Sequence, residues 1–308
     1  MSNFIVTGAA GFIGSALAAE LIQNGHTVVT IDNLSTGYET NIPDGVEFIL
    51  GDCGDNETIK KIPKRNYDAI FHIAGQSSGE ISFDNPVYDI STNTVSTLLL
   101  LDYARQHGCD RFIYAGTMSV YGMQPEKPVN EDSHCSPSSF YGVGKLASEH
   151  YLKIYQPFGI DTTSLRLFNV YGPGQNLENL RQGMVSIYLA QIFKNGFVEM
   201  KGSVDRYRDF IYIDDVVKSF LNCLVYEDSK NEIINIATGR KTNVGELVDL
   251  CFQLCEREPD LRISGSTSGD LHGIFADTNK MKEILNISQT LPLELGLENM
   301  IKWMRGTS

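Results

Sequence analysis

The sequence lacks the long apolar runs, the excess of positive charge and the grouped metal ligands that mark several large classes of protein. No apolar run approaches the roughly eighteen residues that a membrane-spanning helix needs, so no membrane segment is expected. Its 25 basic and 38 acidic residues give a net charge of −13, and such a surface repels nucleic-acid phosphates. Among the six cysteines only Cys251 and Cys255 lie close together, and no second pair or nearby histidine completes a zinc site. We therefore expect no membrane, nucleic-acid or metal partner, and we expect free thiols.

The sequence shows no internal repeat or low-complexity linker, and we expect no secretory leader. The first apolar stretch, at residues 4–6, follows no basic segment and is soon interrupted by Gly8 and Gly11. This is typical of a buried strand and not of a signal peptide, so it predicts a cytoplasmic protein. At 308 residues, with 42% apolar and 20% charged, the chain has the size and composition of a globular enzyme of one large or two modest domains.

What the first half does contain is a regular alternation of two patterns. Short apolar runs rich in Val and Ile lie at residues 3–7, 27–31, 46–50, 69–73, 111–115 and 162–167. Segments of helical period lie between them, near residues 12–24, 56–62, 86–107 and 141–156. Strands that read as continuous apolar runs and alternate with helices are typical of a parallel sheet covered on both faces. The pattern predicts an α/β protein with a doubly wound parallel (Rossmann) sheet.

The second half has a different pattern. Loop-forming residues cluster at 172–183, a helix is expected at 184–195, and short mixed elements follow. We predict a main domain at 1–172, to which some later segments return, and a smaller C-terminal α/β lobe at 173–308. That lobe would cover the carboxyl edge of the sheet, where ligands bind in open α/β folds.

Three glycines mark the turn after the first expected strand. Within residues 7–14, Gly8 permits a tight turn, Gly11 lets the backbone approach a pyrophosphate, and Gly14 allows close helix–strand contact. The following helix would present its N-terminal amides to the phosphates. Asp32 ends the second run, where a carboxylate binds ribose hydroxyls and repels a 2′-phosphate. The combination predicts NAD binding in preference to NADP; an ordinary tight turn is the alternative.

Two further segments follow expected strands at the same edge of the sheet. Asp52 and Cys53 come after the third run and would meet the adenine. Ala74, Gly75 and Gln76 come after the fourth run and would let the backbone lie along the cofactor. Either segment alone would also fit a simple strand-ending loop.

A candidate catalytic group follows the fifth expected strand. Tyr141 and Lys145 are four residues apart and therefore share a helix face. A neighbouring ammonium and a cationic nicotinamide ring would both favour the phenolate, which can exchange a proton with an alcohol. Thr117 ends the fifth run and can hydrogen-bond the reacting oxygen. A Tyr/Lys pair on any amphipathic helix, and a threonine that caps a loop, are the structural alternatives.

As an ordered set, these features resemble the extended short-chain dehydrogenase/reductases, and specifically the NAD-dependent epimerase/dehydratase family that acts on nucleotide sugars. The resemblance covers nearly the whole chain. The matching pieces are the glycine turn at 7–14, residues 32–37, residues 72–75, Thr117 before Val-Tyr-Gly, Tyr141 with Lys145, residues 165–173 and residues 208–216.

The resemblance implies a tightly bound NAD, a nucleotide-diphosphate sugar as substrate and a proton and hydride removed at a sugar carbon, usually C4. It makes Thr117, Tyr141 and Lys145 the catalytic residues. The cofactor-binding residues would be Gly8, Gly11, Phe12, Ile13, Gly14, Asp32, Asn33, Ser35, Thr36, Gly37, Asp52, Cys53, Ala74, Gly75, Gln76, Asn93, Tyr141 and Lys145. Those expected at the adenosine half are Asn33, Ser35, Thr36, Gly37, Asp52, Cys53 and Asn93. A homodimer through the helices near 86–107 and 141–156 is also implied.

The implied substrate-binding residues are Ser78, Glu80, Thr117, Asn169, Arg181 and Arg208. A guanidinium suits a diphosphate, which supports Arg208, although a surface pair with Asp205 or Asp209 is the alternative. Glu80 would bind a sugar hydroxyl, or it would be a solvated loop residue.

The chain departs from the family pattern at two places. Family members that dehydrate sugars have an Asp-Glu pair after the catalytic threonine, whereas this chain has Met118 and Ser119, which disfavours elimination of water. Many relatives also have an arginine before the Gly-Asp of a late loop, and none precedes Gly269 here; Arg181 or Arg206 would compensate. The leading hypothesis is a nucleotide-sugar 4-epimerase. A C4-dehydrogenase or 4-keto-reductase with the same triad, and a non-catalytic dinucleotide sensor, are the alternatives.

Overall fold

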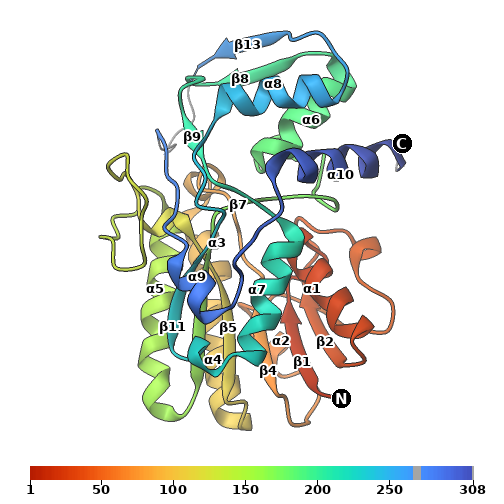
Figure 1. The fold of residues 1–308 in the computed structure, drawn as a ribbon. Coiled ribbons are helices and arrows are strands. Elements are labelled where there is room, and N and C mark those ends of the chain that lie inside the picture. Colours follow the sequence, from red (N-terminus) through yellow and green to blue (C-terminus); the bar gives the residue numbers. More distant parts are fainter. Residues whose placement is uncertain (266–271, 307–308) are drawn as a thin grey trace.

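The central element of the fold is a seven-stranded parallel sheet (Figure 1). In a computed structural model, which describes residues 1–265 and 272–306, its strand order is β11-β6-β5-β4-β1-β2-β3. The strands are β1 (Asn3–Thr7), β2 (Thr27–Asp32), β3 (Glu47–Leu50), β4 (Ala69–His72), β5 (Arg111–Thr117), β6 (Asp161–Leu167) and β11 (Glu232–Ile236). The first six lie where the apolar runs predicted them, so the predicted doubly wound α/β fold is confirmed.

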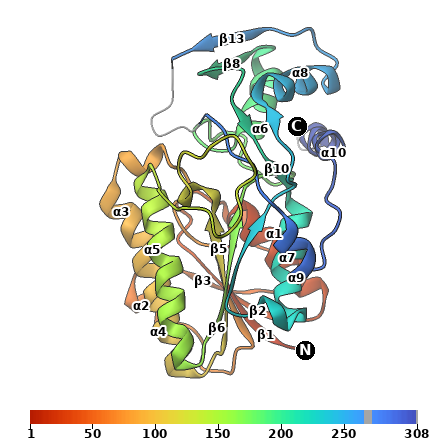
Figure 2. The ribbon, with the colours of Figure 1, turned by 60° about the vertical axis from the view of Figure 1, so that its left-hand side comes forward.

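Helices cover both faces of this sheet (Figure 2). On one face lie α1 (Phe12–Gln23) and α7 (Ile213–Val225), which pack on each other. On the other face lie α2 (Asn56–Ile59), α3 (Pro86–Ile90), α4 (Ser96–His107) and α5 (Phe140–Tyr155). Apolar side chains fill both interfaces because a parallel sheet is buried on both sides.

Two helices differ from their predictions. The helix expected at 56–62 ends at Ile59, and its last turn tightens because Lys61 donates to Thr58 three residues back and Pro63 cannot continue a helix. The segment 86–107 is continuous but contains a π-helical turn at Ser91–Val95 between α3 and α4. Such turns insert one residue into a helix and often occur at functional sites.

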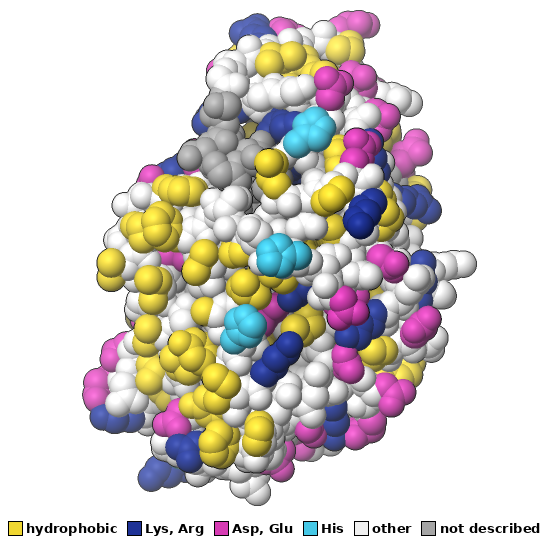
Figure 3. All heavy atoms as spheres, turned by 90° about the vertical axis from the view of Figure 1, so that its left-hand side faces the viewer, with side chains coloured by type: hydrophobic (Ala, Val, Ile, Leu, Met, Phe, Trp, Pro, Cys, Tyr) yellow, Lys and Arg dark blue, Asp and Glu magenta, His cyan; other side chains and the backbone are white. Residues whose placement is uncertain are grey.

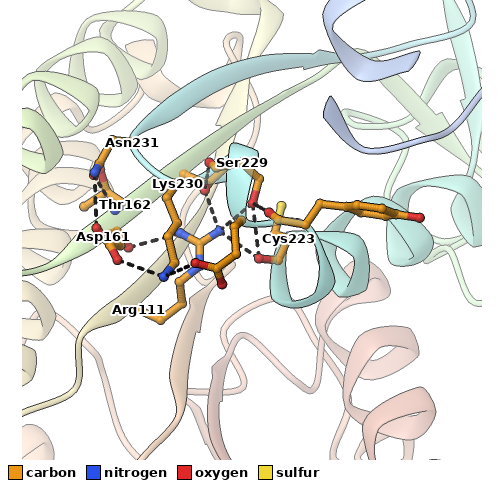
Figure 4. A network of polar contacts seen from close by, with 10 residues as sticks. Arg111, Asp161, Thr162, Cys223, Ser229, Lys230 and Asn231 are labelled. Carbon is orange, nitrogen blue, oxygen red and sulfur yellow. Dashed lines mark hydrogen bonds and ion pairs between the residues drawn. The ribbon is translucent and has the colours of Figure 1, made fainter. Parts of the chain in front are cut away.

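The main domain also takes up segments from beyond residue 172. The edge strand β11 pairs with β6, and α7 packs beside β6 and α1. At the amino end of the sheet Arg111 joins these parts (Figure 4). Its guanidinium donates to Thr163 Oγ1 at 2.7 Å, to Cys223 O at 2.9 Å and to Ser229 Oγ at 3.0 Å. Because the Cys223 carbonyl lies in the last turn of α7, the negative end of the helix dipole helps to stabilise the buried cation.

The remaining elements form a smaller lobe above the carboxyl ends of the strands (Figure 1). Its helices are α6 (Met184–Asn195), α8 (Val244–Leu254) and α10 (Leu293–Gly306), while α9 (Asn279–Ile284) packs on β11. Its paired strands are β7 (Asn169–Tyr171) with β10 (Phe210–Tyr212), β9 (Tyr207–Arg208) with β12 (Thr242–Asn243), and β8 (Val198–Lys201) with β13 (Leu261–Ser264). Among the described residues, no helix has both the length and the apolar character that crossing a bilayer requires.

Candidate active site

The glycine turn has the geometry of an anion-binding loop. Gly8 has a φ of +78°, which favours glycine. A Cβ on Gly14 would lie 2.1 Å from the carbonyl oxygen of Gly8, so no side chain fits there. The helix α1 begins after Gly11 without a side-chain cap, which leaves its first amides free to bind phosphate. The residues present therefore fit a dinucleotide pyrophosphate.

Asp32 lies next to this turn at the end of β2. Its carboxylate accepts hydrogen bonds from the amides of Ala10 at 2.9 Å and Leu34 at 2.8 Å. The adjacent Asn33 donates to Asp52 at 2.9 Å and so joins the ends of β2 and β3. These contacts hold a carboxylate at the rim of the cleft, where the sequence predicted the ribose to bind.

The turn and the strand ends line one side of a continuous opening. This opening has two parts. Most of the predicted cofactor residues line the first part, the first cleft: Gly8, Gly11, Phe12, Ile13, Gly14, Asp32, Asn33, Ser35, Thr36, Gly37, Asp52, Cys53, Ala74 and Gly75. A second cleft, between the main domain and the lobe, adjoins it because Ser77 and Gln182 line both. The predicted substrate residues Ser78, Glu80, Asn169, Arg181 and Arg208 all line this second cleft.

The three predicted catalytic residues are not among the residues that line either cleft, but they lie next to residues that do. Thr117 ends β5 and accepts a hydrogen bond from the amide of Ser119 at 3.2 Å. Ser139 caps α5 by accepting from Gly142 at 3.1 Å, which fixes the start of the helix that carries Tyr141. All three side chains are buried beneath the clefts, while the neighbouring Met118 and Ser139 line the second cleft.

The pKa of Tyr141 differs from the expectation that the neighbouring ammonium would favour the phenolate. Burial raises the pKa of Tyr141 to about 12, the hydrogen bond with Thr117 lowers it, and the charge of Asp89 raises it. Lys145 lies with its ammonium 5.9 Å from the centre of the tyrosine ring, yet burial dominates in the free protein. A cationic ring bound beside the phenol would be needed to favour the phenolate.

Lys145 lies in a dry pocket behind the tyrosine. Its ammonium donates to the carbonyl of Ala115 at 3.1 Å and lies 4.7 Å from the ring centre of Tyr114. Burial lowers its pKa to about 8, and the charges of Asp89 and Glu149 raise it. A lysine held this way keeps its charge near neutral pH and loses it in mildly alkaline solution.

Asn93 and Gln76 lie beside Lys145 and not among the residues of the first cleft. Asn93 is fully buried in the π-helical turn, and its amide donates to the carbonyl of Gln76 at 2.9 Å. A Cβ on Gly75 would lie 2.3 Å from Asn93 Oδ1 and 3.5 Å from Lys145 Nζ. The expectation that Asn93 lies at the adenosine half stays a prediction; its side chain lies next to Gly75, which lines the first cleft.

The predicted substrate side chains fall into two groups. Arg208 is buried, and it donates to the carbonyls of Tyr207 at 2.8 Å and His272 at 3.3 Å. Arg181 is half exposed and pairs with Asp84 at 2.7 Å and with Glu80 at 3.7 Å. Glu80 is therefore held by an arginine at the rim, an arrangement that the sequence did not predict.

Other predicted details can be placed as well. Asn169 donates its side-chain amide to the carbonyl of Asp209 at 3.0 Å. Asp209 does not pair with Arg208 as one alternative had it; its carboxylate accepts from Thr238, Gly239 and Ala276. The departure at residues 266–270 lies outside the described residues.

Several residues of the two clefts were missed by the sequence analysis. They come from many separate segments, among them the loop after β7 and the helix α6, whose spacing carries no local signal. The first cleft also contains Ala10, Tyr38, Asn41, Gly51, Ile73, Tyr88, Thr92, Gly174, Gln175, Asn176, Asn179 and Ser186. The second also contains Gly79, Ser119, Ser138, Leu180, Ile187, Tyr188, Gln191, Glu199 and Lys201, together with Arg206, which the sequence analysis named as a replacement for the missing arginine.

The helix that carries Tyr141 and Lys145 is fixed to the sheet by a buried ion pair. Glu149 on α5 binds Arg166 on β6 through two nitrogens, at 3.0 and 2.7 Å, with both side chains at most 4% exposed. Ser164 donates a further hydrogen bond to Glu149 at 2.9 Å. This pair sets the position of α5 against β6 one helical turn beyond Lys145.

Comparison with known proteins agrees with this geometry. The sequence profile described as the NAD dependent epimerase/dehydratase family matches residues 4–237. A protein of Methanocaldococcus jannaschii, whose name marks it as a provisional UDP-glucose 4-epimerase, is 34% identical over 306 residues, which is 99% of each chain.

Two solved structures are similar over the whole chain. The UDP-glucose 4-epimerase of Thermotoga maritima with UDP-glucose is 33% identical with a TM-score of 0.95 and 99% of each chain covered. That of Thermus thermophilus with NAD is 30% identical with a TM-score of 0.91, covering 99% of this chain and all of the other. The resemblance seen in the sequence is confirmed: the chain belongs to the NAD-dependent epimerase/dehydratase family, and its cofactor is NAD.

Proposed function

We propose that this protein is a UDP-hexose 4-epimerase that keeps its NAD between turnovers. The observation that carries the proposal is that Thr117 and Tyr141 are buried next to Met118 and Ser139, which line a cleft that contains arginines and adjoins the dinucleotide cleft. The solved relatives that bind NAD and UDP-glucose have the same fold at TM-scores of 0.91 and 0.95. The domain division follows the same logic, with 1–172 mainly binding NAD and 173–308 mainly binding the nucleotide sugar.

On this proposal NAD is held by the glycine turn and the strand ends that line the first cleft. Asp32 would bind the adenosine ribose hydroxyls, and Lys145 would bind the ribose next to nicotinamide. When bound, NAD accepts a hydride from C4 of the sugar and returns it. Gln182 donates a hydrogen bond to Ser77 across the opening, so the loop after β7 crosses the cofactor cleft and would slow its exchange.

The protein's own groups would handle the proton. Thr117 orients the C4 hydroxyl and Tyr141 removes its proton, since both lie at the carboxyl end of β5 beside the second cleft. The same tyrosine returns the proton after the sugar has turned its other face. Met118 and Ser119 follow the threonine, and neither can eliminate water by acid–base chemistry, which fits an epimerase and not a dehydratase.

The nucleotide diphosphate would occupy the second cleft. Arg208 is buried at its wall, and a guanidinium binds phosphate through two parallel hydrogen bonds. Asn169 would hold the diphosphate with it. Ser78, Glu80 and Arg181 would face the sugar from the loop after β4 and the loop after β7.

The experiment that tests this proposal is incubation of the purified protein with UDP-glucose and no added cofactor. We expect UDP-galactose at unchanged mass, separated from the substrate by ion-pair chromatography, because the hydride leaves and returns within one active site. Formation of a product two mass units lighter, or a strict need for added NAD, would instead indicate a dehydrogenase. Conversion of UDP-galactose to UDP-glucose is the matched reverse reaction.

We also propose a homodimer formed through α3, α4 and α5. These helices carry large exposed apolar side chains, among them Val87 at 77%, Val143 at 55% and Ile154 at 56% exposure. Apolar side chains gather on this side of the molecule in Figure 3. A second copy of the chain would cover them, because contiguous apolar patches on a protein surface mark interaction sites.

The dimer is tested by the double variant Val143→Lys/Ile154→Lys. Charges placed on this face of α5 should block its burial, so sedimentation velocity should show a monomer where the unmodified chain sediments as a dimer. Val225→Lys at the end of α7, exposed to 69%, is the matched control and should stay dimeric. An unchanged dimer in the double variant would rule out this face.

A further inference from the structure

Asp89 is a buried carboxylate that has no role in the proposed mechanism. It lies in α3, is fully buried, and has one oxygen that accepts no hydrogen bond from the described residues. Its other oxygen accepts from Gln76 Nε2 at 2.9 Å and from Asn93 Nδ2 at 3.2 Å. A buried carboxylate without an ion pair is costly, so its position needs an explanation.

The contacts of Asn93 determine which way its amide points. Its nitrogen has two acceptors, the Gln76 carbonyl and the Asp89 carboxylate, so its oxygen must be the atom directed toward Gly75 and Lys145. That oxygen accepts no hydrogen bond from any described residue, Lys145 included. Asp89 thereby turns an acceptor, and not a donor, toward the ammonium.

The free oxygen of Asp89 faces the same place from the helix side. A Cβ on Gly144, the residue before Lys145, would lie 3.5 Å from Asp89 Oδ2. Asp89 on α3 therefore lies within van der Waals reach of α5 at the residue before Lys145. The carboxylate and the amide oxygen together surround the lysine pocket with negative potential, which stabilises a cation in a site of low dielectric.

The other titratable groups around Lys145 are either paired or uncharged. Glu149 on α5 is paired with Arg166, and burial lowers the pKa of His72 on β4 to about 3, which leaves that ring neutral. Burial raises the pKa of Tyr114 on β5, so it too is uncharged. Tyr141, on the same helix, is a neutral phenol in the free protein. Among the described residues Asp89 is thus the unpaired carboxylate nearest to the lysine.

We infer that Asp89 is a positioning residue that keeps the ammonium of Lys145 charged and directs the acceptor of Asn93 toward it. This inference rests on the proposed function, in which a charged Lys145 supports Tyr141. Because the negative charge of Asp89 favours the protonated form of both neighbours, it sets the pH range over which the pair is active.

The test is the variant Asp89→Asn, which removes the charge but keeps the size of the side chain. Loss of the charge lowers the pKa of Lys145 from about 8 and that of Tyr141 from about 12, since Asp89 raises both. We therefore expect both limbs of the pH–kcat profile for UDP-glucose to move to lower pH, by about one unit. Asp102→Asn, an exposed carboxylate on α4, is the matched control with an unmoved profile.

A second readout does not depend on activity. The ultraviolet absorbance of phenolate, measured for each protein against its Tyr141→Phe partner, gives the titration of Tyr141 alone. This titration should also move to lower pH in Asp89→Asn. A lower kcat with an unmoved profile, or a move to higher pH, would overturn the inference and leave Asp89 with a packing role. No epimerisation by the unmodified chain would contradict the proposed function instead, while the absorbance titration would still report on Asp89.

Discussion

Tyr141→Phe should lose nearly all turnover of UDP-glucose, by roughly a thousandfold in kcat, while the protein stays folded and keeps its cofactor. The phenol is the proposed proton acceptor, and the ring alone fills the same buried space beneath the clefts. Because Phe retains the packing of the ring, the change removes chemistry and little else. Chromatography of the sugar nucleotides measures kcat, and absorbance of the released cofactor after denaturation measures bound NAD.

The control for this variant lies on the same helix. Tyr151→Phe removes a hydroxyl that is part of the core packing around α5 and has no place in the site, so its kcat should change little. If Tyr141→Phe kept more than about a tenth of the activity, the general-base role would be wrong. A non-catalytic dinucleotide sensor would show no turnover in any form of the protein.

Removal of one partner of the Glu149–Arg166 pair should give the largest loss of stability, about 3–5 kcal/mol in the free energy of unfolding. The two side chains are at most 4% exposed, so a single partner would leave a buried charge without its counterion. Glu149→Leu and Arg166→Met should each lower the urea midpoint of unfolding. Activity should fall as well, because Lys145 lies one turn away on the same helix.

The double variant Glu149→Leu/Arg166→Met tests whether the loss of stability comes from the unpaired charge. An apolar pair of similar volume leaves no uncompensated charge, so the double variant should regain at least half of the stability that either single variant loses. Simple addition of the two single losses would instead show that the sites act independently and that the pair does not hold α5 on β6. Circular dichroism during urea titration measures all four proteins.

The parts of the site that the sequence predicted well are local. Gly8 and Gly14 belong to one strand–turn–helix unit, and the steric need for glycine follows from that unit alone. Tyr141 and Lys145 share a helix face by spacing. The placement of Asp32 needed only the rule that parallel strands end at the same edge of a sheet.

The parts of the site that the sequence did not predict depend on contacts between distant segments. Asn93 packs on α5, where Ser148 donates to its carbonyl, because it lies in the π-helical turn, and no sequence pattern in residues 91–95 predicts that turn. Arg181 meets Glu80 across a separation of about a hundred positions in the chain, where only packing of the lobe brings them together. The strand at Glu232–Ile236 was not predicted individually, and its place beside β6 is set by pairing with a segment far away in the chain.

The sequence by itself determined the doubly wound sheet, the NAD turn and the Thr–Tyr–Lys group, because periodicity, glycine sterics and i,i+4 spacing act within a few residues. Only the tertiary structure decided that α7 and β11 are the later segments that complete the first domain, that Glu80 is held by Arg181, and that Asp89 binds Asn93. Those arrangements arise because charges and amides are buried between elements that are far apart in the chain. In such a site of low dielectric each buried polar group needs a partner, and no local sequence pattern predicts which residue that partner is.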